Sequence, residues 1–577
     1  MRRSLIPMLT LAAVPAVVVW QSAAVPTPSV QAPRLEPVTF SEHIAPILYE
    51  NCVTCHRPGE AAPFSLISYE DVSRRARLIA DVTRSRYMPP WHAEPGFGDF
   101  LDERRLTDAQ IERIGEWVRQ GRPRGDATKM PTLPAFTDGW QLGKPDLVLE
   151  MPEAFEVPAD GPDVYRNFVI PVPIPERRYV RALAFRPGNP KVVHHALIKV
   201  DQNGEGRRRD QQDSELGFPG MVIRSDAGHF LSWQPGRLPL PAPSGLSWEI
   251  HPGNDLVVQM HMSPSGKRED VQPSIGFYFT DEPPNATPFR ILLTSITMDI
   301  PAGETNYAIT DDYTLPVDVD ALAILPHAHY LGKKIAAWAT LPNGQTKPLI
   351  RIDDWDFNWQ SDYQYKTPVS LPAGTKLSTK FTFDNSTNNI RNPHHPPQRV
   401  RYGLESTDEM AELWLQVLPK HKEDFNTLRA DYARKAQTRF FEGNLTNARN
   451  NPSDAAANAI VGQIYFLQER FAEAEKHLRA AVAADPNHAP GRYGLGVLFR
   501  HMNKLPEAQT ELEAAARLDP QDPRPHSNLG FIALVNDDLD RARTHFQAAL
   551  KLNPADRLAQ AGTEELARRL NDKKPRN

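Results

Sequence analysis

A periodic pattern of small residues near the end of the chain constrains its fold more than any other feature. Three sets of residues recur at intervals of 34, namely Gly462, Gly496 and Gly530; Ala474, Ala508 and Ala542; and Pro486, Pro520 and Pro554. Small side chains at fixed positions let two helices approach closely, and a proline at the end of each unit stops the second helix. The pattern therefore predicts stacked helix pairs from residue 453 to residue 577.

This arrangement, with Gly in the first helix, Ala in the second and Pro at the end, resembles the tetratricopeptide repeat. The resemblance implies an α-helical solenoid whose concave groove binds a protein or peptide partner. An array that only caps the chain or joins two copies of it is the alternative. Residues 419–452, just before the repeats, are expected to form a helical connector.

The first residues have the features of a secretory signal. Arg2 and Arg3 form a basic start, Leu5–Trp20 is almost wholly apolar, and Ser22-Ala23-Ala24 offers a small-residue cleavage site. Residues 1–24 are therefore predicted to be a signal peptide, and the mature chain to be periplasmic or otherwise exported, with no membrane span. An uncleaved anchor is the alternative, but the apolar run is shorter than the roughly 20 residues that a span needs.

Both cysteines of the chain lie in one five-residue motif, Cys52-Val53-Thr54-Cys55-His56. This spacing is the attachment signature of c-type haem, in which both thiols bind the haem and the histidine coordinates its iron. The alternatives are a thioredoxin-like redox pair, which needs a surrounding βαβ pattern, and half of a zinc site, which needs two more ligands of suitable spacing. The sequence meets neither condition, so we expect one covalent haem c held by Cys52, Cys55 and His56.

The motif lies in a segment with helical periodicity. Apolar residues recur at helical spacing over Phe40–Tyr49, Tyr69–Arg84 and Thr107–Gln120. The segment resembles a class I cytochrome c domain. The expected bounds are 25–37 for a first linker, 38–125 for the cytochrome c-like domain and 126–145 for a second linker.

The sixth haem ligand should lie further along the same domain. Met88, in Arg86-Tyr87-Met88-Pro89-Pro90-Trp91, is the preferred candidate, because the prolines hold an extended loop that can present a thioether. A Met/His ligand pair raises the haem potential. His92 is the rival ligand, and simple core packing is the ordinary role of a lone methionine.

Between residues 146 and 418 the helical periodicity gives way to a different sequence pattern. Short β-branched and aromatic runs alternate with clusters of Pro, Gly, Asn and Asp, which is typical of antiparallel β-sandwiches. The runs include Lys191–Val200, Asp255–Met262, Ser274–Phe279, Ala321–Leu325 and Lys376–Phe383. The stretch is long enough for two β-sandwich domains, expected over 146–288 and 289–418 with a break near 285–292.

Three groups of histidines fall on these expected strands or at their ends. They are His194-His195, His261 and His327-Ala328-His329. Alternate residues of a strand share a face, so His327 and His329 can hold one ion from the same side. The adjacent His194 and His195 can do so only if their strand ends or bulges there. Each histidine taken singly is an ordinary packed or surface residue, but together they suit copper or zinc.

The order and setting of these histidines resemble the copper type II, ascorbate-dependent monooxygenases. The matching stretches are Val193-His-His-Ala196, Gln259-Met-His-Met262, Pro326-His-Ala-His-Tyr-Leu-Gly332, Ser406-Thr-Asp-Glu-Met-Ala-Glu-Leu413, and the turn Asp384-Asn385-Ser386 with Asn392-Pro393 and Pro396-Pro397. The resemblance covers roughly 146–418. It implies two jelly-roll β domains, each with one copper ion, on either side of a solvent-filled cleft.

Carried over residue by residue, the resemblance implies two metal sites. His194, His195 and His261 would hold an electron-transfer copper, while His327, His329 and Met410 would hold the catalytic, oxygen-binding copper. The residue types fit this chemistry, because imidazoles serve both oxidation states of copper and a thioether favours Cu(I). His394 and His395, which stand between prolines, are expected in an exposed loop and not as ligands.

Two departures from the family are informative. The animal enzymes are braced by disulfides, which this chain cannot form once a haem takes both cysteines. The positions at which the peptidylglycine enzyme has an Arg and a Tyr to grip the substrate carboxylate are Leu325 and Trp414 here. Neither can pair with a carboxylate, so a small apolar or aromatic organic substrate is expected in place of a peptidylglycine.

The sequence thus predicts a multidomain chain with a cytochrome c-like helical domain, two antiparallel β-sandwiches and a tetratricopeptide solenoid. The predicted function is a monooxygenase with two copper ions that hydroxylates a C–H bond with dioxygen and takes electrons from an external donor through the haem. A non-catalytic haem and copper electron-transfer or copper-binding protein, a zinc hydrolase and an assembly scaffold are the rivals. The net charge of −5 gives no indication of nucleic-acid binding.

Overall fold

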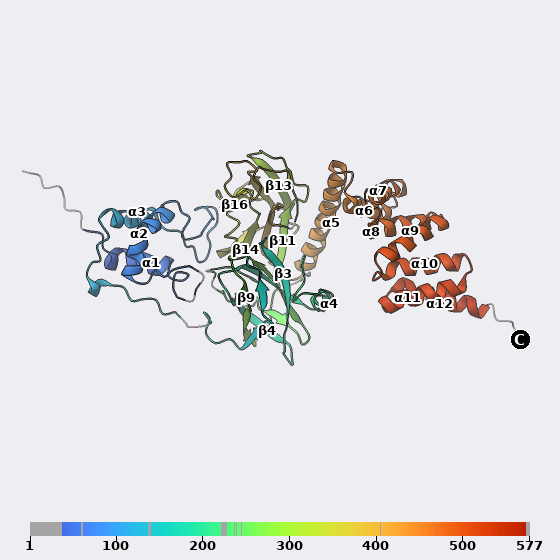
Figure 1. The fold of residues 1–577 in the computed structure, drawn as a ribbon, viewed down its shortest axis with the longest axis horizontal. Coiled ribbons are helices and arrows are strands. Elements are labelled where there is room, and N and C mark those ends of the chain that lie inside the picture. Colours follow the sequence, from blue (N-terminus) through green and yellow to red (C-terminus); the bar gives the residue numbers. More distant parts are fainter. Residues whose placement is uncertain are drawn as a thin grey trace, which may run out of the picture.

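The computed structural model shows three parts arranged along the long axis of the molecule (Figure 1). A helical module and a helical array lie on opposite sides of a central pair of β domains. The structure describes residues 37–572 apart from 59, 61, 137–139, 221–227, 236, 238, 244 and 404. The predicted signal peptide, 1–24, lies outside this range. Within it, no helix is both long and apolar enough to cross a membrane.

The N-terminal module consists of short helices at the predicted places. They are the π-helix Phe40–Ile44, which leads into α1 (Ala45–Asn51), α2 (Tyr69–Arg84), α3 (Asp108–Arg119) and the 3₁₀ turn Ala127–Lys129. Ser68 accepts a hydrogen bond at the start of α2, and Thr107 and Gln110 form a reciprocal capping box at the start of α3. Phe40 and Trp117 are buried in its core. The helices agree with the prediction, whereas a cytochrome c identity stays a prediction.

The first β domain is built from two four-stranded antiparallel sheets. Their orders are β1-β10-β4-β7 and β3-β8-β5-β6, and a β2-β9 ribbon completes the domain. The elements are β1 (Leu147–Glu150), β2 (Phe155–Val157), β3 (Val164–Pro171), β4 (Arg178–Arg186), β5 (Val193–Asp201), α4 (Glu205–Asp210), β6 (Ser232–Trp233), β7 (Trp248–Ile250), β8 (Asp255–Met262), β9 (Glu269–Val271) and β10 (Ser274–Thr280). Apolar side chains of both sheets form one core.

The second β domain repeats this plan. Its sheets have the orders β11-β20-β14-β17 and β13-β18-β15-β16, with a β12-β19 ribbon. The strands are β11 (Phe289–Thr294), β12 (Asp299–Ile300), β13 (Tyr307–Thr314), β14 (Val319–His327), β15 (Gly332–Thr340), β16 (Thr346–Ile352), β17 (Tyr363–Leu371), β18 (Lys376–Phe383), β19 (Val400–Arg401) and β20 (Glu412–Pro419). Two antiparallel β domains were expected, and the structure confirms them.

A segment of the N-terminal module, residues 93–101, joins the second β domain, which the sequence did not predict. Ala93 and Phe100 form antiparallel bridges with Ile352 at the end of β16 and with Tyr365 in β17. Both Ala93 and Phe100 belong to the core of that domain. The helical module is therefore fixed to the second β domain by main-chain pairing and by buried side chains.

The C-terminal array consists of antiparallel helix pairs (Figure 1). The helices are α5 (Asp424–Asn450), α6 (Ala455–Leu467), α7 (Phe471–Ala484), α8 (Ala489–His501), α9 (Leu505–Leu518), α10 (Pro523–Val535), α11 (Leu539–Leu552) and α12 (Arg557–Asp572). The periodic glycines lie where paired helices touch, since a Cβ at Gly462 would come within 2.6 Å of the Leu478 side chain. This close approach explains the 34-residue pattern.

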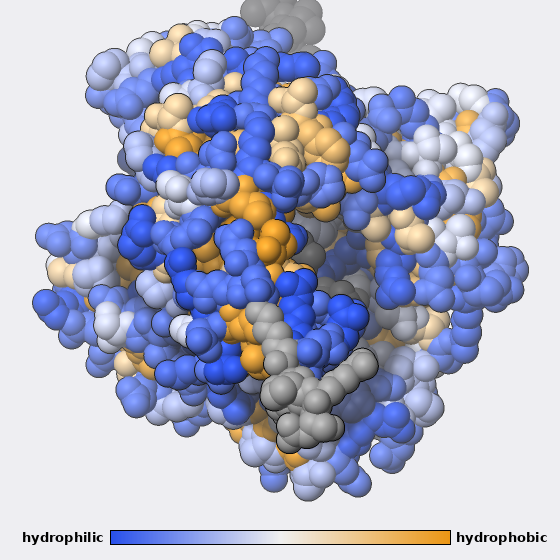
Figure 2. Space-filling model, turned by 90° about the vertical axis from the view of Figure 1, so that its right-hand side faces the viewer, coloured by the Kyte–Doolittle hydropathy of each residue, from blue (hydrophilic) through white to orange (hydrophobic). Residues whose placement is uncertain are grey.

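The array also exposes apolar side chains. Phe440 on α5, Leu467 on α6 and Val535 on α10 are each at least half exposed. Figure 2 shows the side of the molecule that carries the array, where orange patches interrupt a largely hydrophilic surface. Exposed apolar patches on a repeat array are typical of surfaces that bind other proteins.

Candidate metal centres

A β-bulge in the first β domain brings three histidines together. The pairing of β5 with β8 shifts register between Val193 and His195, so that His194 is the extra residue. This is the irregularity that the adjacent histidines require in order to share one ion. The candidate ligand nitrogens of His194, His195 and His261 all lie within 4.8 Å of one another. The structure therefore assembles these three predicted ligands.

The three imidazoles of His194, His195 and His261 share one feature, a buried Nδ1 atom without a hydrogen-bond partner among the described residues. His261 donates its Nε2 proton to Asp163 at 2.7 Å, and Tyr165 stacks on its ring at 4.2 Å. A carboxylate that fixes the outer nitrogen of a histidine is the usual support of a metal ligand.

The electrostatics of the group favour neutral imidazoles. Burial lowers the pKa of His194 to about 4 and that of His195 well below its usual value, and the neighbouring His261 adds to both shifts. Burial raises the pKa of Asp163, but the hydrogen bonds from His261 and Ser263 and the nearby imidazoles together leave that pKa below its usual value. Neutral imidazoles at His194 and His195, beside a charged carboxylate, fit a copper or zinc ion.

Removal of the supporting carboxylate tests this site. We expect Asp163→Ala to weaken copper binding at the His194–His195–His261 group by about 10–100-fold, because His261 loses the partner that fixes its tautomer. A competition titration of the full chain with a copper chelator measures the change. The exposed Asp160→Ala on the same loop is the control. Equal copper affinity in the two variants would show that Asp163 supports no ligand.

The second histidine group lies at the end of β14. His327 is the last residue of that strand, His329 follows just beyond it, and their rings are 5.1 Å apart. Here the Nδ1 atoms are already engaged, that of His327 with the Gln360 side chain and that of His329 with the carbonyl oxygen of Asp408 at 3.1 Å. The Nε2 atoms are therefore the ones available to a metal, in contrast to the first group.

Glu409 joins this pair to Met410. Its fully buried carboxyl group accepts hydrogen bonds from the backbone N–H of His329, of Leu331 at 2.9 Å and of Met410 at 2.8 Å. Burial raises the pKa of Glu409 to about 8. Met410 is itself buried. The carboxyl group thus holds the main chain of two predicted ligands in place, a role that the sequence analysis missed although the residue precedes Met410 directly.

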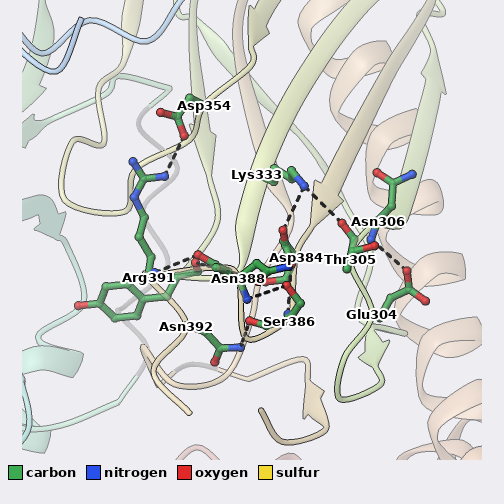
Figure 3. A network of polar contacts seen from close by, with 12 residues as sticks. Glu304, Thr305, Asn306, Lys333, Asp354, Asp384, Ser386, Asn388, Arg391 and Asn392 are labelled. Carbon is green, nitrogen blue, oxygen red and sulfur yellow. Dashed lines mark hydrogen bonds and ion pairs between the residues drawn. The ribbon is translucent and has the colours of Figure 1, made fainter. Parts of the chain in front are cut away.

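A turn around Asp384 carries a network of polar contacts, which Figure 3 shows, and part of it reaches the chain just after His329. The N–H of Asp384 donates to the carbonyl of Leu331 at 2.8 Å. The Asp384 carboxylate pairs with the Lys333 ammonium group at 3.1 Å. Asn385 donates to the carbonyl oxygens of Pro301 and Gln398, and Asn392 donates to the Asn385 side chain. The turn that resembles the monooxygenase family therefore braces the main chain just after His329.

The two histidine groups face each other across a buried phenylalanine. The Phe357 ring centroid lies 5.8 Å from that of His261 and 5.5 Å from that of His329. Its side chain is 1% exposed. Phe357 comes from the loop between β16 and β17 and packs against both groups. The solvent-filled cleft that the resemblance implies stays a prediction.

The expected substrate positions lie beside the second group. Leu325 on β14 stands opposite Trp414 on β20. The Arg290 guanidinium lies 5.6 Å from the centroid of the Trp414 ring. The two residues that replace the family's carboxylate grip are thus adjacent in space and present an aliphatic and an aromatic side chain.

The haem-attachment motif follows α1. His56 places its Nδ1 atom 3.1 Å from the carbonyl oxygen of Phe64, which leaves Nε2 available to an iron ion. Cys52 and Cys55 are free thiols, and burial raises the pKa of Cys52 to about 12. These residues fit a thioether-linked haem. Met88 and His92 both line one cavity of 430 Å³, so the choice of sixth ligand stays a prediction.

Comparisons with known proteins agree with part of this picture. Residues 292–428 match the family model described as copper type II ascorbate-dependent monooxygenase, C-terminal domain. Residues 465–530 and 523–556 match two tetratricopeptide-repeat models. No curated protein matches the chain.

Solved structures resemble a small part of the chain. The first tetratricopeptide domain of Spaghetti (RPAP3), bound to an HSP90 peptide, is 19% identical, with 21% of this chain and 96% of that one covered and a TM-score of 0.20. The Arabidopsis OM64 tetratricopeptide domain is 15% identical, with 21% and 98% covered and the same TM-score of 0.20. The family models thus show one region similar to the C-terminal domain of copper type II ascorbate-dependent monooxygenases and a second region similar to tetratricopeptide repeats.

Proposed function

We propose that this chain is an exported copper monooxygenase that hydroxylates a C–H bond of a small organic substrate, with electrons supplied through a covalently attached haem. The observation that carries the proposal is the arrangement of two histidine groups on either side of Phe357. One group offers three Nδ1 atoms, and the other offers two Nε2 atoms beside Met410. A set of three imidazoles suits a copper ion that transfers electrons, and a set of two imidazoles and a thioether suits a copper ion that binds dioxygen.

When bound, copper supplies electron transfer at the His194–His195–His261 site and dioxygen activation at the His327–His329–Met410 site. The residues of the chain do the rest. The Asp163 carboxylate holds the Nε2 atom of His261, and the Asp408 carbonyl oxygen holds the Nδ1 atom of His329. The other ring nitrogen of each histidine is then left for a metal ion. Overall, one substrate C–H bond becomes C–OH, dioxygen supplies that oxygen atom and forms water with the other, and two electrons and two protons are consumed.

We propose that those electrons enter the protein at the haem. Cys52, Cys55 and His56 would hold it, and Met88 is the preferred sixth ligand. An external one-electron donor would reduce it, and export would place the protein where such donors and c-type haem maturation are found. The tetratricopeptide repeats favour an additional protein partner.

The main rival is a haem and copper protein that transfers electrons but does not activate oxygen. The family match of residues 292–428 favours the monooxygenase, because it includes His327, His329 and Met410. A zinc hydrolase needs a free carboxylate base beside its metal, whereas the Glu409 carboxyl group is occupied by main-chain hydrogen bonds and the Asp163 carboxylate by His261.

Metal and haem analysis of the full chain tests the proposal. We expect protein matured with haem and loaded with copper to contain two copper ions and one haem per chain. Electron paramagnetic resonance should show two type II copper signals and one low-spin haem. His195→Ala and His327→Ala should each remove a different copper signal. Protein that takes up zinc and no copper, or that attaches no haem, would contradict the proposal.

A further inference from the structure

One loop of the second β domain contacts both histidine groups and also His92, the rival candidate for the sixth haem ligand. This loop, residues 353–362, connects β16 to β17. Phe357 lies between the two histidine groups, and Gln360 bonds to His327. Trp355, which is 1% exposed, lies between the N-terminal module and His329.

The N-terminal module is fixed to the two strands that carry this loop. Glu94 donates its N–H to the carbonyl of Arg351 on β16 at 2.7 Å. Leu101 donates to the carbonyl of Gln364 on β17 at 2.8 Å. The module is thus held by main-chain hydrogen bonds on both sides of the loop, which gives the contact between them a defined geometry.

The loop meets the module beside the candidate haem ligands. The cavity of 430 Å³ is lined by Met88 and His92 on the module side and by Asp356 and Arg391 on the β side. The His92 ring lies 6.5 Å from that of Trp355. The Nε2 atom of His92 is buried and has no partner within the described residues. An unpaired buried nitrogen at this wall indicates a group that the cavity is shaped to receive.

Trp355 connects this wall to the second metal site. Its indole N–H donates to the carbonyl oxygen of His329 at 3.3 Å. The ring is tightly held, since a Cβ at Gly332 would lie 2.6 Å from it. The same loop also reaches the first histidine group, through the Phe357 ring beside His194 and His261 and through Asn358, which hydrogen-bonds to His194.

We propose that Trp355 is the route by which an electron passes from the haem module to the His327–His329–Met410 site. The inference rests on the function proposed above and adds to it where the electron enters. In this step the haem iron goes from ferrous to ferric and the copper from Cu(II) to Cu(I), with an external one-electron donor restoring the ferrous haem. A rigid aromatic ring with a hydrogen bond to a ligand residue couples the two sites more strongly than a gap would.

Electron transfer within the full chain tests the proposal. Oxidised, copper-loaded protein is mixed without oxygen with one electron equivalent of dithionite, and haem reoxidation is followed by absorbance and loss of Cu(II) by electron paramagnetic resonance. We expect Trp355→Leu to slow haem reoxidation by about tenfold or more, the range for loss of an outer-shell partner of a metal ligand. Trp355→Phe keeps an aromatic ring but loses the hydrogen bond. Its rate of haem reoxidation should lie between the rates of Trp355→Leu and the unaltered chain.

Trp359→Leu is the matched control, because it removes an indole from the same loop. Copper-free Trp355→Leu should keep the haem spectrum and midpoint potential of the unaltered chain, which separates a lost route from a damaged haem site. Equal reoxidation rates in Trp355→Leu, Trp359→Leu and the unaltered chain would overturn the role of Trp355. Failure of the unaltered chain to pass any electron from haem to copper would instead contradict the proposed function itself.

Discussion

Glu409→Ala is expected to lower the free energy of unfolding of the second β domain by about 3–9 kcal/mol, since each of three buried N–H groups left without an acceptor costs about 1–3 kcal/mol. The carboxyl group serves three such donors, on His329, Leu331 and Met410. The carboxyl group is fully buried, so bulk solvent does not contact these donors directly. The variant should also lose copper at the second site, because the main chain of two ligands is no longer held.

The measurement is denaturant unfolding of the full chain, followed by fluorescence of the tryptophans, together with copper content. Glu409→Gln keeps one accepting oxygen but adds an N–H₂ group that faces donors, so it should have a smaller cost than alanine. Glu405→Ala, an exposed change a few residues earlier, is the control. A Glu409→Ala variant as stable as this control would mean that the three N–H groups find other acceptors.

The sequence predicted the fold wherever a local pattern carries the information. The bounds of β8 and β18 agree with the predicted Asp255–Met262 and Lys376–Phe383, because alternation and turn residues mark them directly. The tetratricopeptide array was equally predictable from the sequence, because its 34-residue period reflects contacts between neighbouring helices. The signal peptide lies outside the described residues, and export stays a prediction.

The candidate site was predicted only as far as the residue types that bind metals. The bulge at His194 was required by adjacent histidines on one strand, and the structure has it. The roles of Asp163 and Glu409 were missed, because a supporting carboxylate is recognised by what it contacts in space. Asp163 is 98 residues from His261 along the chain, and Glu409 is 80 residues from His329. No spacing rule connects residues that far apart.

The docking of residues 93–101 onto β16 and β17 could not be predicted for a related reason. Ala93 and Phe100 lie in a short stretch without strand periodicity, and each forms a single bridge. The same holds for the β16–β17 loop, whose sequence shows only that it is aromatic. Which metal site its rings contact depends on how three domains pack together.

Met410→Ala is expected to reduce reductant-dependent oxygen consumption of the haem- and copper-loaded chain by about 100-fold or more, beyond the 10–100-fold typical of losing an outer-shell partner. The thioether is the one soft donor proposed for the second site, and it favours the Cu(I) state that meets dioxygen. Cu(I) affinity of that site should fall, while the signal of the His194–His195–His261 copper remains. An oxygen electrode and copper titration measure both effects.

Loss of a buried methionine also destabilises a domain, by about 2–5 kcal/mol for truncation to alanine. Met298→Ala is the matched control, because Met298 is 2% exposed in the core of the same β domain and Met410 is 5% exposed. Both variants remove the same atoms, but only one removes a proposed ligand. If oxygen consumption falls equally in both, stability explains the loss. If Met410→Ala consumes oxygen as fast as the unaltered chain, the second site does not activate oxygen, and the non-catalytic electron-transfer protein becomes the better account of this chain.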